Sequence, residues 1–189
     1  MNLYSTVLTK TNKHNVERII LHPDTLTSKI GRSQQLELLA KSLSELSDRI
    51  GNHVLICIEP RGGDRQGKVL RNHIQDIEIL QQMLKTLGEK RVCLCIDIAQ
   101  LYIVHGNIGI VNFLKKIKSI QLPVKEFHLS DVFRSKYVKN RVAMEIGTGL
   151  VDWQLLLPFI FVHCNELLIE TLGGIKVFQK SKEFLKSVI

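Results

Sequence analysis

Four apolar stretches of this sequence end on a side chain that can bind a metal ion or move a proton. These stretches, "HVLICIEP", "VCLCIDIAQ", "VKEFHLSD" and "NELLIETLGG", carry Glu59, Asp97, His128 and Glu170 at their ends. Carboxylates and imidazole serve enzymes as general acids and bases and as ligands of divalent ions. A fifth stretch, "RIILHPDT", reaches His22 in the same way. Because the pattern recurs, we expect these side chains to share one site.

The segments that carry these side chains alternate between strand and helix patterns. Short apolar runs predict strands at residues 18–22, 53–59, 91–97, 124–130 and 165–170. Apolar residues three and four positions apart predict helices over 31–51, 68–88, 109–120 and 151–163, and a last helix starts at about residue 175. Gly88 is suited to stop the second helix, and Pro158 kinks the fourth or ends its first part. The polar residues 131–149 predict a loop.

Consecutive strand–helix units predict an α/β fold with a parallel sheet or barrel, because parallel strands need helical crossovers. The 189 residues suffice for one domain, residues 1–189, with a sizeable core. In such folds the carboxyl ends of the strands meet at one rim. The five side chains at the strand ends would therefore converge there.

Three carboxylates that converge without a counter-charge repel one another, and a divalent cation removes this conflict. Each residue also has a structural explanation. Asp97 and Glu59 could cap the next helices or pair with Arg61 or Arg65. His128 could be a hydrogen-bonded core residue, and Glu170 could face water. Without a metal, four strand–helix units would each have to place such a side chain at the same position by chance. This repetition favours the metal site.

The cysteines lie in or beside the same apolar runs, at Cys57, Cys93, Cys95 and Cys164. Without a CxxC pair they predict buried, reduced thiols in a cytoplasmic protein, and "CLC" as a metal clip is the alternative. Side chains alternate along a strand, so Cys95 shares the face of Asp97, and Cys57 shares the face of Glu59.

The net charge of +8 is spread along the chain, which predicts solvated helix faces, with nucleic-acid binding as the alternative. In the loop "RGGDRQGK", Arg61, Arg65 and Lys68 directly follow Glu59. We expect them to contact an anionic group such as a sugar phosphate or a nucleic-acid backbone; an exposed basic loop is the alternative. No stretch has the length of a membrane span, and the first residues lack a secretory signal, which predicts a cytoplasmic location.

The motifs "ILHPDT", "ICIEPRGG", "VCLCIDIAQ", "EFHLSD", "AMEIGTGLVDW" and "LLIETLGG" follow one another in the chain. Their order resembles the xylose-isomerase-like TIM-barrel superfamily, which includes sugar isomerases, ketose 3-epimerases and apurinic endonucleases of the endonuclease IV type. The resemblance extends from about residue 18 to the end of the sequence. It is moderately specific for the superfamily and poorly specific for the reaction.

The resemblance implies one divalent metal ion (Mn, Mg, Co or Zn), held by Glu59, Asp97, His128 and Glu170. Glu59 and Glu170 would also transfer protons to and from substrate carbon. Substrate-binding residues would be His22, Gln100, Arg134 and Arg61. In the endonuclease and epimerase branches a histidine typically stands where this sequence has Gln100. The Asp-x-His pair of the endonuclease branch matches Arg141 and Ala143, which cannot rebuild its zinc site.

The resemblance begins at the fourth strand of an eight-stranded barrel, a fold that usually takes about 250 residues. We therefore expect an incomplete TIM-type (β/α) barrel with about five of eight strands, and an oligomer or partner chain that covers its open side. The leading hypothesis is a metal-dependent sugar isomerase or epimerase that acts on a small sugar or sugar phosphate. The alternatives are an apurinic-endonuclease-like phosphodiesterase that acts on DNA and a non-catalytic truncated relative.

Overall fold

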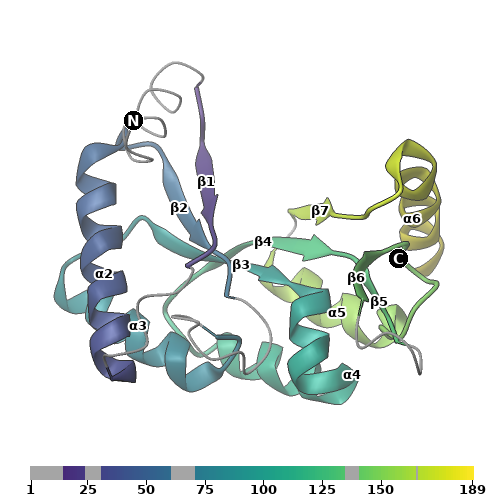
Figure 1. The fold of residues 1–189 in the computed structure, drawn as a ribbon, viewed down its shortest axis with the longest axis horizontal. Helices are drawn as coiled ribbons and strands as arrows, with labels where there is room; N and C mark the ends of the chain where they lie inside the picture. The colour runs from purple at the N-terminus through teal and green to yellow at the C-terminus, as the bar shows by residue number, and fades with distance from the viewer. Residues whose placement is uncertain (1–14, 24–30, 61–70, 135–140, 165) are drawn as a thin grey trace.

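Five parallel strands form one sheet in the order β1, β2, β3, β4, β7 (Figure 1). The computed structural model describes residues 15–23, 31–60, 71–134, 141–164 and 166–189. The strands are β1 (Arg18–Leu21), β2 (Leu55–Ile58), β3 (Val92–Asp97), β4 (Val124–Leu129) and β7 (Leu167–Ile169). All five predicted strands are present, and they form half of a (β/α) barrel, which confirms the expected fold class.

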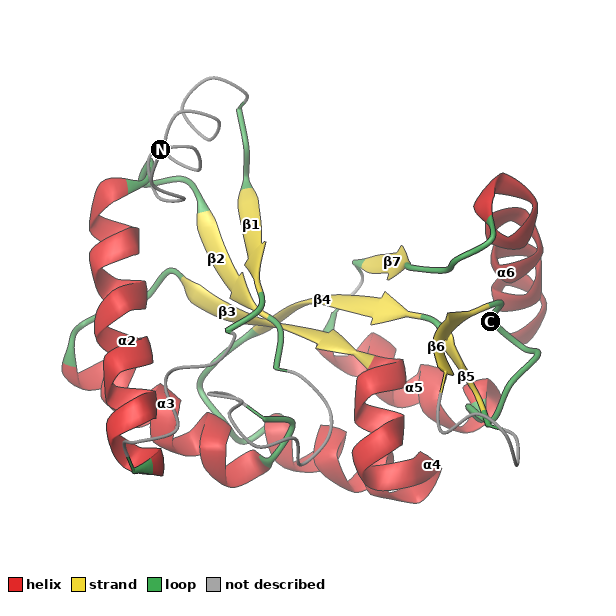
Figure 2. Cartoon of the chain, viewed as in Figure 1, coloured by secondary structure: helices red, strands yellow, loops and turns green. Residues whose placement is uncertain are grey.

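Helices cover one side of this sheet. In the described part of the chain they are α2 (Arg32–Arg49), α3 (Ile74–Thr86), α4 (Ile98–Ile117) and α5 (Trp153–His163), and α6 (Gly174–Val188) follows β7. Figure 2 shows α2 to α5 along one side of the curved sheet, with β1 and β7 at its two ends. Side chains that alternate along the strands therefore meet two different environments.

The two faces of the sheet pack differently. Ile56, Leu94 and Phe127 belong to the main core, together with apolar residues of the helices. Cys57, Cys93 and Cys95 form a separate buried cluster on the other face, as the alternation predicts. All four cysteines of the chain are free. The prediction that Cys164 is buried is wrong, because it lies just past the end of α5 and is partly exposed.

A buried carboxylate joins α3 to α2. Asp76, in the first turn of α3, accepts a hydrogen bond of 3.1 Å from Arg32 Nε and one of 3.1 Å from Arg71 Nε. Burial alone would raise the pKa of Asp76, but the two guanidinium groups outweigh it and hold that pKa below its ordinary value.

Two predicted helix boundaries are wrong. The helix predicted over 109–120 begins much earlier, at Ile98, because Asp97 caps it directly after the strand. Gly106, with φ of 62°, breaks the helical geometry inside α4. The helix predicted over 68–88 begins at Ile74, and residues 68–70 lie outside the described part of the chain. Gly88 follows this helix with φ of 72°, a conformation that favours glycine.

The stretch predicted as a loop over 131–149 contains β5 (Asp131–Phe133) and β6 (Arg141–Met144), which pair antiparallel. The sequence prediction missed these strands because they are only three and four residues long and lie in a mostly polar stretch. Pro158 lies inside α5, which continues to His163, so it does not end the helix. Among the described helices, none combines the length and apolar composition that a membrane span requires.

Candidate metal centre

The carboxyl ends of neighbouring strands bring the predicted site residues to one rim. Glu59 directly follows β2, Asp97 ends β3 and His128 lies near the end of β4. Asp97 and His128 are direct partners in the pairing of β3 with β4. Glu170 follows β7, the next strand of the sheet.

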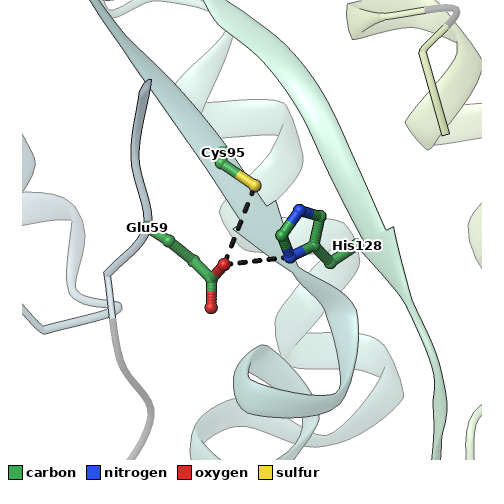
Figure 3. Close-up of side chains that lie close together, drawn as sticks. All are labelled: Glu59, Cys95 and His128. Atoms are coloured by element: carbon green, nitrogen blue, oxygen red, sulfur yellow. Dashed lines mark hydrogen bonds and ion pairs between the residues drawn. The ribbon is translucent and has the colours of Figure 1, made fainter. Parts of the chain in front are cut away.

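His128 lies between two carboxylates. Its Nδ1 is 2.9 Å from Glu59 Oε2 and 3.1 Å from Glu170 Oε2. Glu59 and His128 are buried, whereas the Glu170 side chain is 56% exposed. Figure 3 shows Glu59 and His128 facing each other from separate strands, with Cys95 beside them. An imidazole and two carboxylates thus converge on one point.

Glu59 also contacts a second histidine. His22 Nδ1, after β1, is 3.4 Å from Glu59 Oε1, and the His22 side chain is 40% exposed. The two oxygens of Glu59 therefore face two different imidazoles. This places His22 beside the cluster, on its solvent side.

The other nitrogen of His128 is held by a carboxylate that sequence reasoning did not select. His128 Nε2 lies 3.2 Å from Glu126 Oε1, and Glu126 Oε2 lies 3.2 Å from Arg18 Nη1. Arg18 also pairs with Glu166, next to β7. A carboxylate that accepts from one imidazole nitrogen directs the other toward a metal. The available signal was spacing, since Glu126 precedes His128 by two residues and shares its face.

The charges of the cluster shift the titration of two residues. Burial alone would lower the pKa of His128, but the contact with Glu59 and the charges of Glu59, Glu170 and Glu126 raise it to about 9. Burial, with the charges of Glu59 and Glu170, raises the pKa of Asp97 to about 6. The shift of His128 reflects the negative charge around its imidazole, which a cation would offset, whereas burial is the main cause of the Asp97 shift.

Asp97 has a structural task as well. Its Oδ1 accepts a 3.0 Å hydrogen bond from the backbone N–H of Gln100, so it is the N-cap of α4. The helix-cap explanation considered for Asp97 is therefore correct, and Gln100 reaches the site through its backbone. Only one carboxylate oxygen is engaged in this hydrogen bond, so the other remains suited to a cation.

The donor set fits a divalent cation. His128 Nδ1 is buried and makes no hydrogen bond of acceptable geometry, although two carboxylate oxygens lie close to it. Among the described residues, the ligand atoms of Glu59, Cys95 and His128 all lie within 4.8 Å of one another. A buried nitrogen that points toward carboxylates without a hydrogen bond is what metal ligation requires.

Arg134 and Arg61 are the remaining predicted substrate-binding residues. Arg134 directly follows β5 and is exposed, and in the described structure it forms no ion pair with the cluster. Arg61, Arg65 and Lys68 fall outside the described residues, so their predicted contact with an anion stays a prediction.

The sequence matches the family described as xylose isomerase-like TIM barrel over residues 11–186. This chain therefore belongs to that family, and the resemblance inferred from its motifs is confirmed. None of the curated proteins matches the sequence.

Several solved structures share the fold. A 3-keto-D-glucoside 4-epimerase from E. coli is similar with a TM-score of 0.66 at 13% identity, over 97% of this chain and 69% of that one. An AP endonuclease of family 2 from Brucella melitensis has a TM-score of 0.68 at 12% identity, over 97% and 66% of the two chains. A xylose isomerase domain protein from Planctomyces limnophilus has a TM-score of 0.68 at 14% identity, over 98% and 62%.

These identities establish the fold alone. The present chain spans between 62% and 69% of the length of these three proteins. That share agrees with a sheet of five strands where a full barrel has about eight.

Proposed function

We propose that this protein is a divalent-metal-dependent isomerase or epimerase that acts on a small sugar or sugar phosphate. The observation that carries the proposal is the convergence of Glu59 and Glu170 on His128 Nδ1, at 2.9 Å and 3.1 Å. These two carboxylates come from strands on either side of β3 and β4, so they approach the site from different directions.

Glu59, Asp97, His128 and Glu170 would hold one ion of Mn²⁺, Mg²⁺, Co²⁺ or Zn²⁺. When bound, such an ion polarises carbonyl and hydroxyl oxygens of a sugar and stabilises the negative charge that develops on them. The negative charge that raises the pKa of His128 supports a cation at this place.

In this proposal Glu59 and Glu170 transfer the protons. One carboxylate removes a proton from the carbon beside the carbonyl group, and the other returns a proton to the substrate. Glu59 is buried between two imidazoles, whereas Glu170 faces solvent and can exchange its proton there. His22, Gln100, Arg134 and Arg61 would orient the sugar.

A phosphodiesterase that acts on apurinic DNA is the second candidate. The net charge of +8 favours it, since it would attract a phosphate backbone. The AP endonuclease with a similar fold adds support. Against it stands Ala143 on β6, which has no group that can ligate a metal at a position where the endonuclease branch carries one.

Solvent isotope exchange tests the leading proposal and separates it from the alternative. With added Mn²⁺ in D₂O, we expect the protein to incorporate deuterium at carbon in at least one member of a panel of ketoses and ketose phosphates, followed by NMR. Glu59→Gln and Glu170→Gln should abolish the exchange, and Glu37→Gln, an exposed change paired with Lys41, should not alter it. Cleavage of an abasic oligonucleotide without any exchange would favour the phosphodiesterase, and neither activity would favour a non-catalytic relative.

Metal content provides a direct check on the centre itself. Elemental analysis should find one divalent ion per chain after dialysis against a metal mixture. Glu59→Gln should lose most of the bound metal. Without this anionic ligand, the imidazole and the remaining carboxylates would bind the ion too weakly to retain it. The same metal content in parent and variant would contradict the proposed ligands.

We also propose that a second copy or another chain covers the open side of the half-barrel at β7. Apolar side chains gather there: Leu168 is 45% exposed, Leu172 66% and Ile175 68%. Keeping such side chains in water costs about 1.5–3 kcal/mol each, enough to favour an interface. Light scattering at micromolar concentration should show an assembly, and a clean monomer that binds no hydrophobic dye would contradict it.

A further inference from the structure

Cys95 faces the candidate metal centre from inside the barrel. It lies two residues before Asp97 on β3, on the same face of the strand, and it is fully buried. Its Sγ is 3.9 Å from Glu59 Oε2, and Figure 3 shows it beside Glu59 and His128. The thiol is thus next to the atoms proposed to bind the metal.

The distances between these atoms can be compared with those around zinc. Bonds of about 2.3 Å to sulfur and about 2.0 Å to nitrogen or oxygen, at tetrahedral angles, separate sulfur from oxygen by about 3.5 Å and nitrogen from oxygen by about 3.3 Å. The observed separations are 3.9 Å for Cys95 Sγ to Glu59 Oε2 and 2.9 Å for His128 Nδ1 to the same oxygen. Small side-chain rotations would close such differences.

A second observation points independently to a ligand at this place. His128 is 5% exposed, and its Nδ1 has no hydrogen bond. Because Nε2 of the same ring lies 3.2 Å from Glu126 Oε1, the ring is held with Nδ1 toward Glu59. A buried nitrogen that makes no hydrogen bond and a buried thiol therefore face the same carboxylate oxygen.

We propose that Cys95 is a ligand of the metal ion, and that its thiolate makes the centre select Zn²⁺ or Co²⁺ over Mg²⁺ and Mn²⁺. This inference rests on the metal centre of the proposed function. Thiolate is a soft ligand that suits zinc, whereas Mg²⁺ and Mn²⁺ prefer oxygen. On binding, the thiol proton is released to solvent and the sulfur lone pair forms the bond to the ion.

Cobalt absorption spectroscopy tests the thiolate directly. Under reducing conditions, the parent protein titrated with Co²⁺ should develop a near-ultraviolet thiolate-to-cobalt charge-transfer band that saturates together with the visible ligand-field bands. Cys95→Ser should lose the charge-transfer band and most of the preference for Zn²⁺ over Mn²⁺ in competition. Cys93→Ser is the matched control, because Cys93 lies on the same strand face but contacts Cys57 Sγ at 2.9 Å. This control should keep the band.

The outcomes separate the inference from the proposal beneath it. Stoichiometric Co²⁺ binding without a charge-transfer band, or with a band that survives in Cys95→Ser, overturns the role of Cys95 and leaves the metal centre intact. Absence of any Co²⁺ or Zn²⁺ binding by the parent overturns both. X-ray absorption of the zinc-loaded parent needs no variant: zinc–sulfur scattering at about 2.3 Å supports the thiolate, and a shell of oxygen and nitrogen alone refutes it.

Discussion

Asp131 offers the sharpest test of how the fold holds the end of β4. The side chain is fully buried. Its Oδ1 accepts hydrogen bonds from the backbone N–H groups of Val132 at 2.8 Å and Val151 at 3.0 Å. Its Oδ2 accepts from the N–H of Gly147 at 2.9 Å and from Trp153 Nε1 at 3.1 Å. One carboxylate thus ties the segment after β6 and the start of α5 to the start of β5, which follows β4 directly.

The magnitude follows from these bonds. In Asp131→Asn one oxygen remains an acceptor, and the amide nitrogen that replaces the other faces two N–H donors. Two hydrogen bonds to a charged group are lost, at about 1.5–3 kcal/mol each, so the free energy of unfolding should fall by about 3–6 kcal/mol. The free energy of unfolding of a typical domain is about 5–15 kcal/mol, so the variant should be near the limit of stability.

Urea unfolding is the assay, followed by far-UV circular dichroism and by the fluorescence of Trp153, the single tryptophan of the chain. Asp152→Asn is the matched control. Asp152 caps α5 by accepting from the Leu155 N–H at 3.0 Å, and asparagine caps a helix about as well as aspartate. The control should therefore unfold like the parent. If Asp131→Asn also unfolds within about 1 kcal/mol of the parent, the reasoning about its buried hydrogen bonds is wrong.

Two further predictions concern the cluster and acid stability. Glu126→Gln should weaken metal binding about 10–100-fold in calorimetric titration, because the His128 ring loses the carboxylate that holds it. Glu166→Gln is the control and should leave the affinity unchanged. Equal affinities for the parent and both variants would contradict this role of Glu126. Because the pKa of Asp76 is lower in the folded state, its contribution of about 1.5–3 kcal/mol is present above its unfolded pKa of about 3.9. It is lost as pH falls through the lower folded value, so urea midpoints between pH 5 and about pH 2 should decline less steeply in Asp76→Asn than in the parent.

The strands and the rim of polar side chains could be predicted from the sequence because both follow from local pattern. An apolar run of strand length that ends on Glu59 or His128 needs no long-range information, and parallel strands bring such ends together. The pattern offered helix capping as an alternative to metal binding for Asp97, but it could not show that capping takes place, because capping depends on where α4 begins. The same limit explains the wrong start of that helix, since a run interrupted by Gly106 reads as a loop.

Residues that act through partners distant in the sequence were missed for a different reason. Glu126 and Arg18 lie 108 positions apart, on β4 and β1, which are not neighbours in the sheet. The role of Asp131 is not visible in the sequence, because three of its four donors, on Gly147, Val151 and Trp153, lie 16 to 22 residues later. Spacing along the chain carries no sign of such contacts.

The half-barrel does not need closure to assemble the candidate centre. Glu59, Cys95, Asp97, His128 and Glu170 come from β2, β3, β4 and β7, which are consecutive neighbours in one sheet. Their mutual positions are therefore set by backbone pairing and by the helices packed behind the sheet, because adjacent strands fix the distance between their ends. Arg18 adds a constraint across the concave face, since it reaches from β1 to Glu126 on β4 and to Glu166 beside β7. Closing the barrel would instead affect Glu170, which is 56% exposed at the last strand of the described sheet. The geometry of the proposed metal site and the protection of Glu170 from water are thus separable properties of this fold, and the five strands provide the first without the second.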